Sequence, residues 1–224
     1  GNLMERNGEI DKAETQYQKA IKEMGPSRSQ AIKLAKAFID INKNQLALDT
    51  YAKARKNATD NYPYAYEIAS LQGNMGNHQQ MIDEYMILIG YNKGYVRTVQ
   101  NNMSRTFDFQ SEDPRVEMLK GSLLQNIQEN PDNQIYYEML MWLFTQRKEF
   151  NAAYVQARAI DKRQSEDGKR LILLASLCSN NEAYGVAAKC YAYIVEEKGK
   201  GSRYYDTAKS LELVSAKRAL MKDI

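Results

Sequence analysis

The chain has 224 residues, a formal net charge of +3 and 43% hydrophobic residues. This composition is ordinary for a folded protein, and the small net charge gives no reason to expect a nucleic-acid-binding protein. No run of 18 apolar residues occurs in the sequence, so we expect no membrane-spanning helix.

Tyrosines recur at a fixed interval in the N-terminal half of the chain. Tyr17, Tyr51 and Tyr85 are each 34 residues apart. A small or apolar residue stands four positions before each tyrosine and another three positions after it, as Ala47 and Ala54 do around Tyr51. A fixed period of this length indicates a solenoid built from one repeated unit.

Each unit is expected to hold two helices joined by a short turn. In the clearest unit, apolar residues at helical spacing over 31–41 are followed by a turn at 42–44 and a second helix. In the next unit we place Pro63 in the first helical turn and a turn at Gly76-Asn77. The pattern predicts an all-α chain, and we place its units at 1–27, 28–61, 62–95, 96–133, 134–167, 168–201 and 202–224.

The unit 96–133 is four residues longer than the others and lacks their small–aromatic–small pattern. We predict a first helix over 95–107 and a second helix that begins at Pro114 and ends at Glu129. Asp113 is suited to cap the second helix, with proline following at the first helical position. The sequence is consistent with a degenerate repeat and with an interruption that changes the curvature.

These residues resemble the tetratricopeptide repeat (TPR) family, whose 34-residue unit carries a small residue, an aromatic residue four positions later and a small residue three positions after that. The resemblance implies a right-handed superhelical solenoid of antiparallel helix pairs. The family's turn glycine is matched by Gly8 and Gly76 and is replaced by Asn42 and Lys148. The pattern stands at Ala13–Tyr17–Ala20, Ala47–Tyr51–Ala54 and Ala187–Tyr191–Ile194.

Residues suited to catalysis or metal binding are sparse. His78 is the single histidine, and we interpret it as a solvated residue of the predicted turn. Cys178 and Cys190 fall on successive predicted helices, where we expect buried free thiols, with a disulfide between them as the alternative. We therefore predict no catalytic activity, no metal and no cofactor.

The resemblance also implies a function, which is binding a protein or peptide partner on the concave face that the first helices line. Counting each unit from its start, we expect five residues to supply the main contacts. Tyr66, Phe107 and Trp142 would give apolar area, and Arg97 and Lys169 would anchor an anionic group.

Two other functions stay open from the sequence. Asn, Gln, Tyr and Trp side chains also suit a carbohydrate- or small-ligand-binding protein, and the chain could equally be an accessory domain of a longer enzyme. The Asn/Tyr/Gln-rich repeats favour an exported bacterial envelope protein, although the compartment is open. The sequence starts in the middle of a repeat, and we interpret Gly1 as the remnant of a cleaved tag, so the native N-terminus is expected to lie further upstream.

Overall fold

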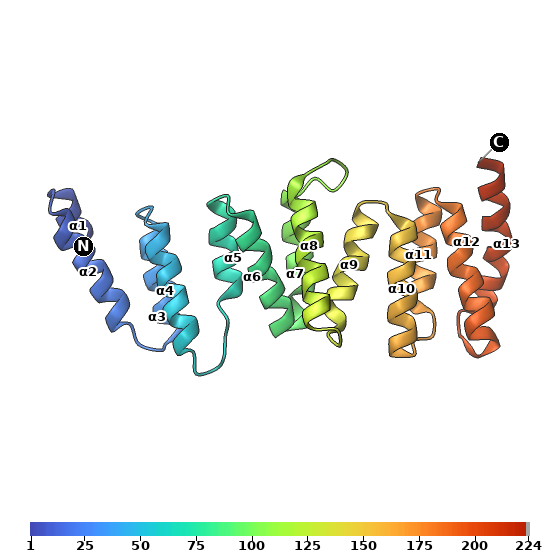
Figure 1. Ribbon diagram of the computed structural model, residues 1–224, viewed down its shortest axis with the longest axis horizontal. Coiled ribbons are helices and arrows are strands. Elements are labelled where there is room, and N and C mark those ends of the chain that lie inside the picture. Colours follow the sequence, from blue (N-terminus) through green and yellow to red (C-terminus); the bar gives the residue numbers. More distant parts are fainter. Residues whose placement is uncertain (223–224) are drawn as a thin grey trace. The chain divides into compact units, whose positions relative to one another are not determined.

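The computed structural model describes residues 1–222. These residues form helices joined by turns and loops, and they contain no strand (Figure 1). Short segments of other helix types are η1 (Lys93–Tyr95), η2 (Ile194–Lys198, a π-helix) and η3 (Gly199–Gly201). Helices that follow one another in sequence pack together, so the predicted all-α solenoid of helix pairs is confirmed. The α-helices are α1 (Asn2–Arg6), α2 (Ile10–Glu23), α3 (Arg28–Ile39), α4 (Asn44–Asn57), α5 (Ala65–Asn74), α6 (His78–Tyr91), α7 (Val96–Thr106), α8 (Pro114–Glu129), α9 (Gln134–Gln146), α10 (Phe150–Gln164), α11 (Lys169–Asn180), α12 (Tyr184–Tyr193) and α13 (Tyr205–Lys222).

The chain forms two compact units, Gly1–Asn101 and a second unit that begins at Asn102. In the first unit, α3 packs on α4 and α5 packs on α6. In the second unit, α9 packs on α10, and α12 packs on both α11 and α13. Contacts between neighbours in sequence are the pattern by which a solenoid is stabilised.

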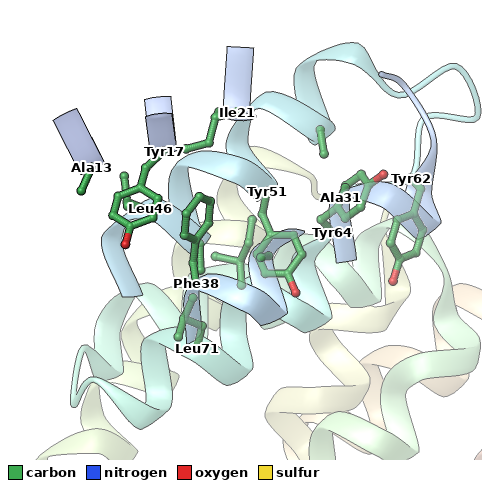
Figure 2. Close-up of a cluster of buried hydrophobic side chains, with 14 residues drawn as sticks. Ala13, Tyr17, Ile21, Ala31, Phe38, Leu46, Tyr51, Tyr62, Tyr64 and Leu71 are labelled. Carbon is green, nitrogen blue, oxygen red and sulfur yellow. The ribbon is translucent and has the colours of Figure 1, made fainter. Parts of the chain in front are cut away.

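The tyrosines of the 34-residue repeat lie in the core of the first unit. Tyr17, Tyr51 and Tyr85 are only 7%, 4% and 5% exposed. The rings of Tyr17 and Phe38 meet edge-on with their centroids 5.5 Å apart, and the Tyr51 ring lies 6.0 Å from that of Tyr64 (Figure 2). The rings of Tyr17 and Tyr51 therefore fill space between neighbouring helices.

Three of the four alanines around Tyr17 and Tyr51 are buried, Ala13 among them. Ala47 and Ala54 flank Tyr51 in the core, but Ala20 of α2 is exposed, so its predicted packing role is wrong. The buried stripe of α2 contains Ile21 in its place. Residues of this stripe follow one another at intervals of four, and Ala20 is rotated away from it by about 100°.

The turns between paired helices share one backbone conformation at equivalent positions. Five of these turns contain a residue with a left-handed backbone, with φ between 57° and 82°. The backbone amide of the following residue donates to the carbonyl five residues before it. In the turn between α3 and α4, for example, the Lys43 amide nitrogen lies 2.8 Å from the Phe38 carbonyl oxygen. This is the hydrogen bond of a Schellman motif, which satisfies a carbonyl at the end of the first helix. Glycine is not required at this position, because Asn, Lys and Glu also occupy it. The five residues are Gly8, Asn42, Gly76, Lys148 and Glu182.

The predicted start and end of α8 are confirmed. The helix has Pro114 at its first position and ends at Glu129. The Asp113 carboxylate accepts the Arg115 backbone amide at 2.9 Å and also binds the Arg115 guanidinium. These bonds hold the pKa of Asp113 well below its ordinary value, because they favour the ionised carboxylate.

Pro63 does not lie in a helix, which corrects the sequence-based assignment. The next residue, Tyr64, has a left-handed backbone with φ of 51°, and α5 begins only at Ala65. The Tyr64 side chain is 1% exposed, and the carbonyl of Pro63 accepts a hydrogen bond from Arg55. Core packing of the Tyr64 ring thus sets the start of the helix, and proline only precedes it.

A buried carboxylate holds the end of α10 in the second unit. Asp161 is fully buried and forms an ion pair of 2.5 Å with Lys198 of the π-helical segment. It also accepts hydrogen bonds from the Tyr193 hydroxyl and the Gly168 amide, each at 2.9 Å. With three partners the buried charge is satisfied, and the segment after α12 is thereby fixed to α10.

Candidate partner-binding surface

The first helices expose a row of side chains in the first unit. On α5, Tyr66 is 39% exposed, and Ser70 and Asn74 follow at intervals of four and are also exposed. The opposite side of α5 carries the buried Ile68 and Ala69. Tyr66 is therefore available for contact, as predicted from its position in the repeat.

The segment that positions Tyr66 is held by a charged stack. The Arg28 guanidinium lies 3.4 Å from the centre of the Tyr62 ring, and it forms an ion pair of 3.7 Å with Glu67. The Tyr62 hydroxyl donates to the Glu67 carboxylate at 3.0 Å. Burial and the adjacent carboxylate raise the pKa of Tyr62. These contacts join the start of α3 to the start of α5.

Arg97 also belongs to the first unit. It lies in the first turn of α7 and is exposed, so its guanidinium is accessible to solvent. Trp142 and Lys169 lie in the second unit together with Phe107. Each unit therefore carries part of the set of contact residues that the repeat predicts.

Phe107 is buried, so its assignment to an exposed ligand-binding face is wrong. Its side chain is 6% exposed, because it follows the buried Val99 and Met103 at intervals of four on the buried side of α7, and its amide still donates to the carbonyl of Met103 at 2.8 Å. The rings of Phe107 and Phe109 lie 5.9 Å apart, and Phe109 in turn meets Trp142 of α9 at 5.3 Å with an interplanar angle of 81°. The count from the start of the unit therefore assigned Phe107 to the wrong side of the helix.

The loop after α7 covers part of α9. Phe109 is 8% exposed, and the side-chain amide of Gln110 donates to the carbonyl of Gln146 at the end of α9. Trp142 consequently is half-buried. The repeat 96–133, which is four residues longer than the others, thus has a folded loop that packs against α9.

α11 is the first helix of its pair, and it exposes two leucines that were not predicted as contact residues from the sequence. Leu173 is 61% exposed and Leu177 is 39% exposed, and they follow the exposed Lys169 at intervals of four. Leu171 and Cys178 lie on the buried side. The signal that could have found the leucines is this four-residue spacing from Lys169 within the helix.

Charged side chains fix α9 and α11 to one another. Arg170 binds Glu138 of α9 at 2.6 Å and Glu166 at 2.9 Å. Because Arg170 is neutralised by these carboxylates, Lys169 is the exposed cation of α11. The exposed stripe that begins at Lys169 therefore continues with two leucines.

A polar groove lies on the first unit, between α4, α5 and α6. Its volume is about 400 Å³, and Arg55 and Glu84 form an ion pair in its wall. Its lining consists mainly of amide and carboxylate side chains over a small apolar floor. The residues are Gln45, Leu48, Asp49, Ala52, Arg55, Ile68, Gln72, Asn77, Gln80 and Glu84. The groove was not predicted from the sequence, because most of its residues lie on α4 and α6, the second helices of their pairs.

The single histidine lies on α6, and the two cysteines lie on the neighbouring helices α11 and α12. His78 begins α6 and is half-buried, which corrects its interpretation as a solvated turn residue. Cys178 and Cys190 are free and buried, as predicted. Burial raises the pKa of Cys178 to about 11 and raises that of Cys190 further. Both thiols are therefore protonated and unreactive at neutral pH.

Two further properties concern the described part of the chain only. Residues 1–222 contain no group of three or more His, Cys, Asp or Glu side chains arranged to hold a metal ion. None of the helices in this range is both long enough and apolar enough to span a bilayer.

The chain is similar in structure to solved proteins but matches none of the sequences compared with it. No protein-family model matches the chain, and no curated protein sequence matches it. The crystal structure of the P58(IPK) TPR domain is similar with a TM-score of 0.32 and 13% identical residues. The alignment covers 98% of this chain and 63% of that structure, so the chain spans less than two thirds of its length. At this TM-score the similarity carries no conclusion about function, and the all-helical fold of the chain rests on its own helices.

Proposed function

We propose that the protein is a non-enzymatic interaction scaffold that binds a peptide segment of another protein on the exposed faces of its first helices. The observation that carries this proposal is the surface of α11. Leu173 and Leu177 are exposed one helical turn apart beside Lys169. Large apolar side chains grouped on a surface are typical of protein-binding sites.

The chemistry of these faces suits a peptide. Leu173, Leu177 and the accessible part of Trp142 offer apolar contact area, while Tyr66 offers a ring and a hydroxyl in the first unit. Lys169 would bind an acidic group of the peptide, as Arg97 would in the first unit. Short polar side chains beside the anchors of each unit would hydrogen-bond the peptide backbone.

Selection from a displayed peptide library, followed by affinity measurements with the selected peptides, tests this proposal. Leu173→Ser should lower the affinity by about tenfold or more, as loss of an interface anchor does. Val155→Ser is the matched control, since Val155 is 58% exposed on α10, a second helix of the same unit. Equal affinities of the wild type and both variants would contradict binding on first helices.

The groove on the first unit supports a second candidate, a carbohydrate or other small polar ligand. Its amide side chains, such as Gln72 and Gln80, offer both donors and acceptors at close spacing. Binding on a glycan array that Gln72→Ala abolishes, with no peptide selected, would favour this function over the scaffold. A role as accessory domain of a longer protein, in the bacterial envelope, would be tested by the full gene sequence.

A further inference from the structure

The last helix, α13, has one buried face and one exposed apolar face. One face packs on α12, where Ala208 and Ser215 are buried. At about 100° of rotation per residue, four large apolar side chains fall in a sector of about 120° on the opposite side. Their exposed fractions are 77% for Leu213, 45% for Val214, 69% for Leu220 and 65% for Met221. We refer to these four residues and Lys217 as the α13 patch.

The four apolar residues form two pairs with a spacing of seven. Leu213 is paired with Leu220, and Val214 with Met221. A seven-residue spacing keeps apolar side chains on one side of a helix and is the spacing by which helices pack along a seam. The α13 patch therefore has the geometry of half of a helix–helix contact.

Lys217 lies at the centre of the patch. It is three or four residues from each of the four apolar side chains, is exposed, and forms no ion pair with another residue of the range 1–222. A partner helix that covers the patch removes this ammonium group from water. The loss of hydration is offset only if the partner supplies a carboxylate opposite the lysine.

The central lysine argues against a second copy of this chain as the partner. A two-fold symmetric contact centred on the patch places Lys217 of one copy near Lys217 of the other. Charge complementarity therefore selects an acidic partner.

We propose that the α13 patch docks an amphipathic helix of another protein, which places an Asp or Glu opposite Lys217 and surrounds it with apolar residues. The apolar ring supplies contact area and excludes water, and the buried charge pair fixes the register and rejects partners without the acid. This inference uses no side chain of α5, α7, α9 or α11, on which the peptide-binding proposal rests, so the two proposals stand separately.

Two synthetic helical peptides test the proposal. Both carry two leucine pairs seven residues apart, and they differ only at the position midway between the pairs, which is Glu in one and Lys in the other. The Glu peptide should bind the wild type at least about tenfold more tightly than the Lys peptide, and Lys217→Glu should reverse this preference. Lys209→Glu is the charge-matched control on the same helix, and it should preserve the preference for the Glu peptide.

A double variant, Leu213→Ser with Leu220→Ser, should lose binding of the Glu peptide while its circular dichroism stays helical. The proposal is overturned if the wild type binds neither peptide, if it binds both equally, or if Lys209→Glu reverses the preference as Lys217→Glu does. It is also overturned if sedimentation shows a dimer that the double variant abolishes, because a second copy then covers the patch. Patch-dependent binding to phosphatidylglycerol vesicles without peptide binding would assign the patch to a membrane surface. The Leu173→Ser experiment reports on the peptide-binding proposal separately.

Discussion

The rings of Phe109 and Trp142 meet edge-on, with their centroids 5.3 Å apart and their planes at 81°. Phe109 belongs to the loop after α7, and Trp142 belongs to α9. This contact therefore joins the repeat 96–133, which is the longest, to the repeat 134–167. Because the loop covers one side of the indole, it determines how much of Trp142 a partner can reach.

Removing the Phe109 ring should expose Trp142. In Phe109→Ala we expect the tryptophan emission to shift to longer wavelength and iodide quenching to increase, because water replaces the ring beside the indole. Trp142 is the only tryptophan, so the signal is unambiguous. Tyr91→Ala, which changes a 47% exposed residue of the first unit, should leave the emission unchanged. An unaltered spectrum of Phe109→Ala would show that the loop does not shield the indole in solution.

Truncation of a repeat tyrosine should be costly. Tyr51→Ala should lower the free energy of unfolding by about 3–5 kcal/mol, since it removes a 4% exposed aromatic ring from the core. Tyr66→Ala is the control, because Tyr66 is 39% exposed and its loss should cost about 0.5 kcal/mol or less. The measurement is urea denaturation followed by circular dichroism. Equal midpoints for the two variants would mean that the role of the repeat tyrosine has been misidentified.

The Schellman turns offer a stabilising substitution. Lys148 has φ of 57°, where a side chain costs about 1–2 kcal/mol and glycine is unstrained. After the greater flexibility of glycine in the unfolded chain is subtracted, Lys148→Gly should raise the free energy of unfolding by about 0.5–1 kcal/mol. Lys148→Ala keeps the strain and should give no such gain. Thermal denaturation of the three proteins measures the difference, and a lower stability of the glycine variant would argue against the left-handed turn.

The ion pair at the start of α8 should make stability depend on pH. The folded-state pKa of Asp113 lies below the unfolded value of about 3.9, so its ionised form stabilises the fold at neutral pH. This contribution is lost as the pH falls below about 4 and through the folded-state pKa. Asp113→Asn retains a good N-cap but no charge. The wild type should therefore be more stable than Asp113→Asn at pH 7, and the gap should narrow on acidification. A gap that stays constant down to about pH 2.5 would exclude the carboxylate as its source.

The two cysteines should be unreactive in the folded protein. With a pKa of about 11, Cys178 is a thiolate in only about one molecule in a thousand at pH 8, and its side chain is buried. Titration with a thiol reagent should show almost no fast reaction in native buffer and two thiols in denaturant. Fast labelling of one native thiol would show that the contact region of α11 and α12 opens readily. A failure to find two thiols in denaturant would show a disulfide.

The sequence by itself determined the local structure, because a helical repeat depends on contacts between neighbours that recur every 34 residues. The spacing of Tyr17, Tyr51 and Tyr85 predicted which rings are buried. The Asp113–Pro114 pair predicted the start of α8, since capping is decided by adjacent residues. The exposure of Tyr66 also followed from its place in the repeat.

Only the tertiary structure decided which side chains remain accessible, because exposure depends on what packs from elsewhere in the chain. Trp142 is partly covered because the loop after α7 folds onto α9 and brings the Phe109 ring against the indole. The exposed Leu173 was missed because counting along the repeat does not fix helix rotation to one residue. The buried Asp161 could not be anticipated, since its partner Lys198 is 37 residues away and lies in a π-helical segment without a sequence signal. Periodicity specifies the helices, whereas rotation, loop docking and buried charge pairs specify the surface that a partner meets.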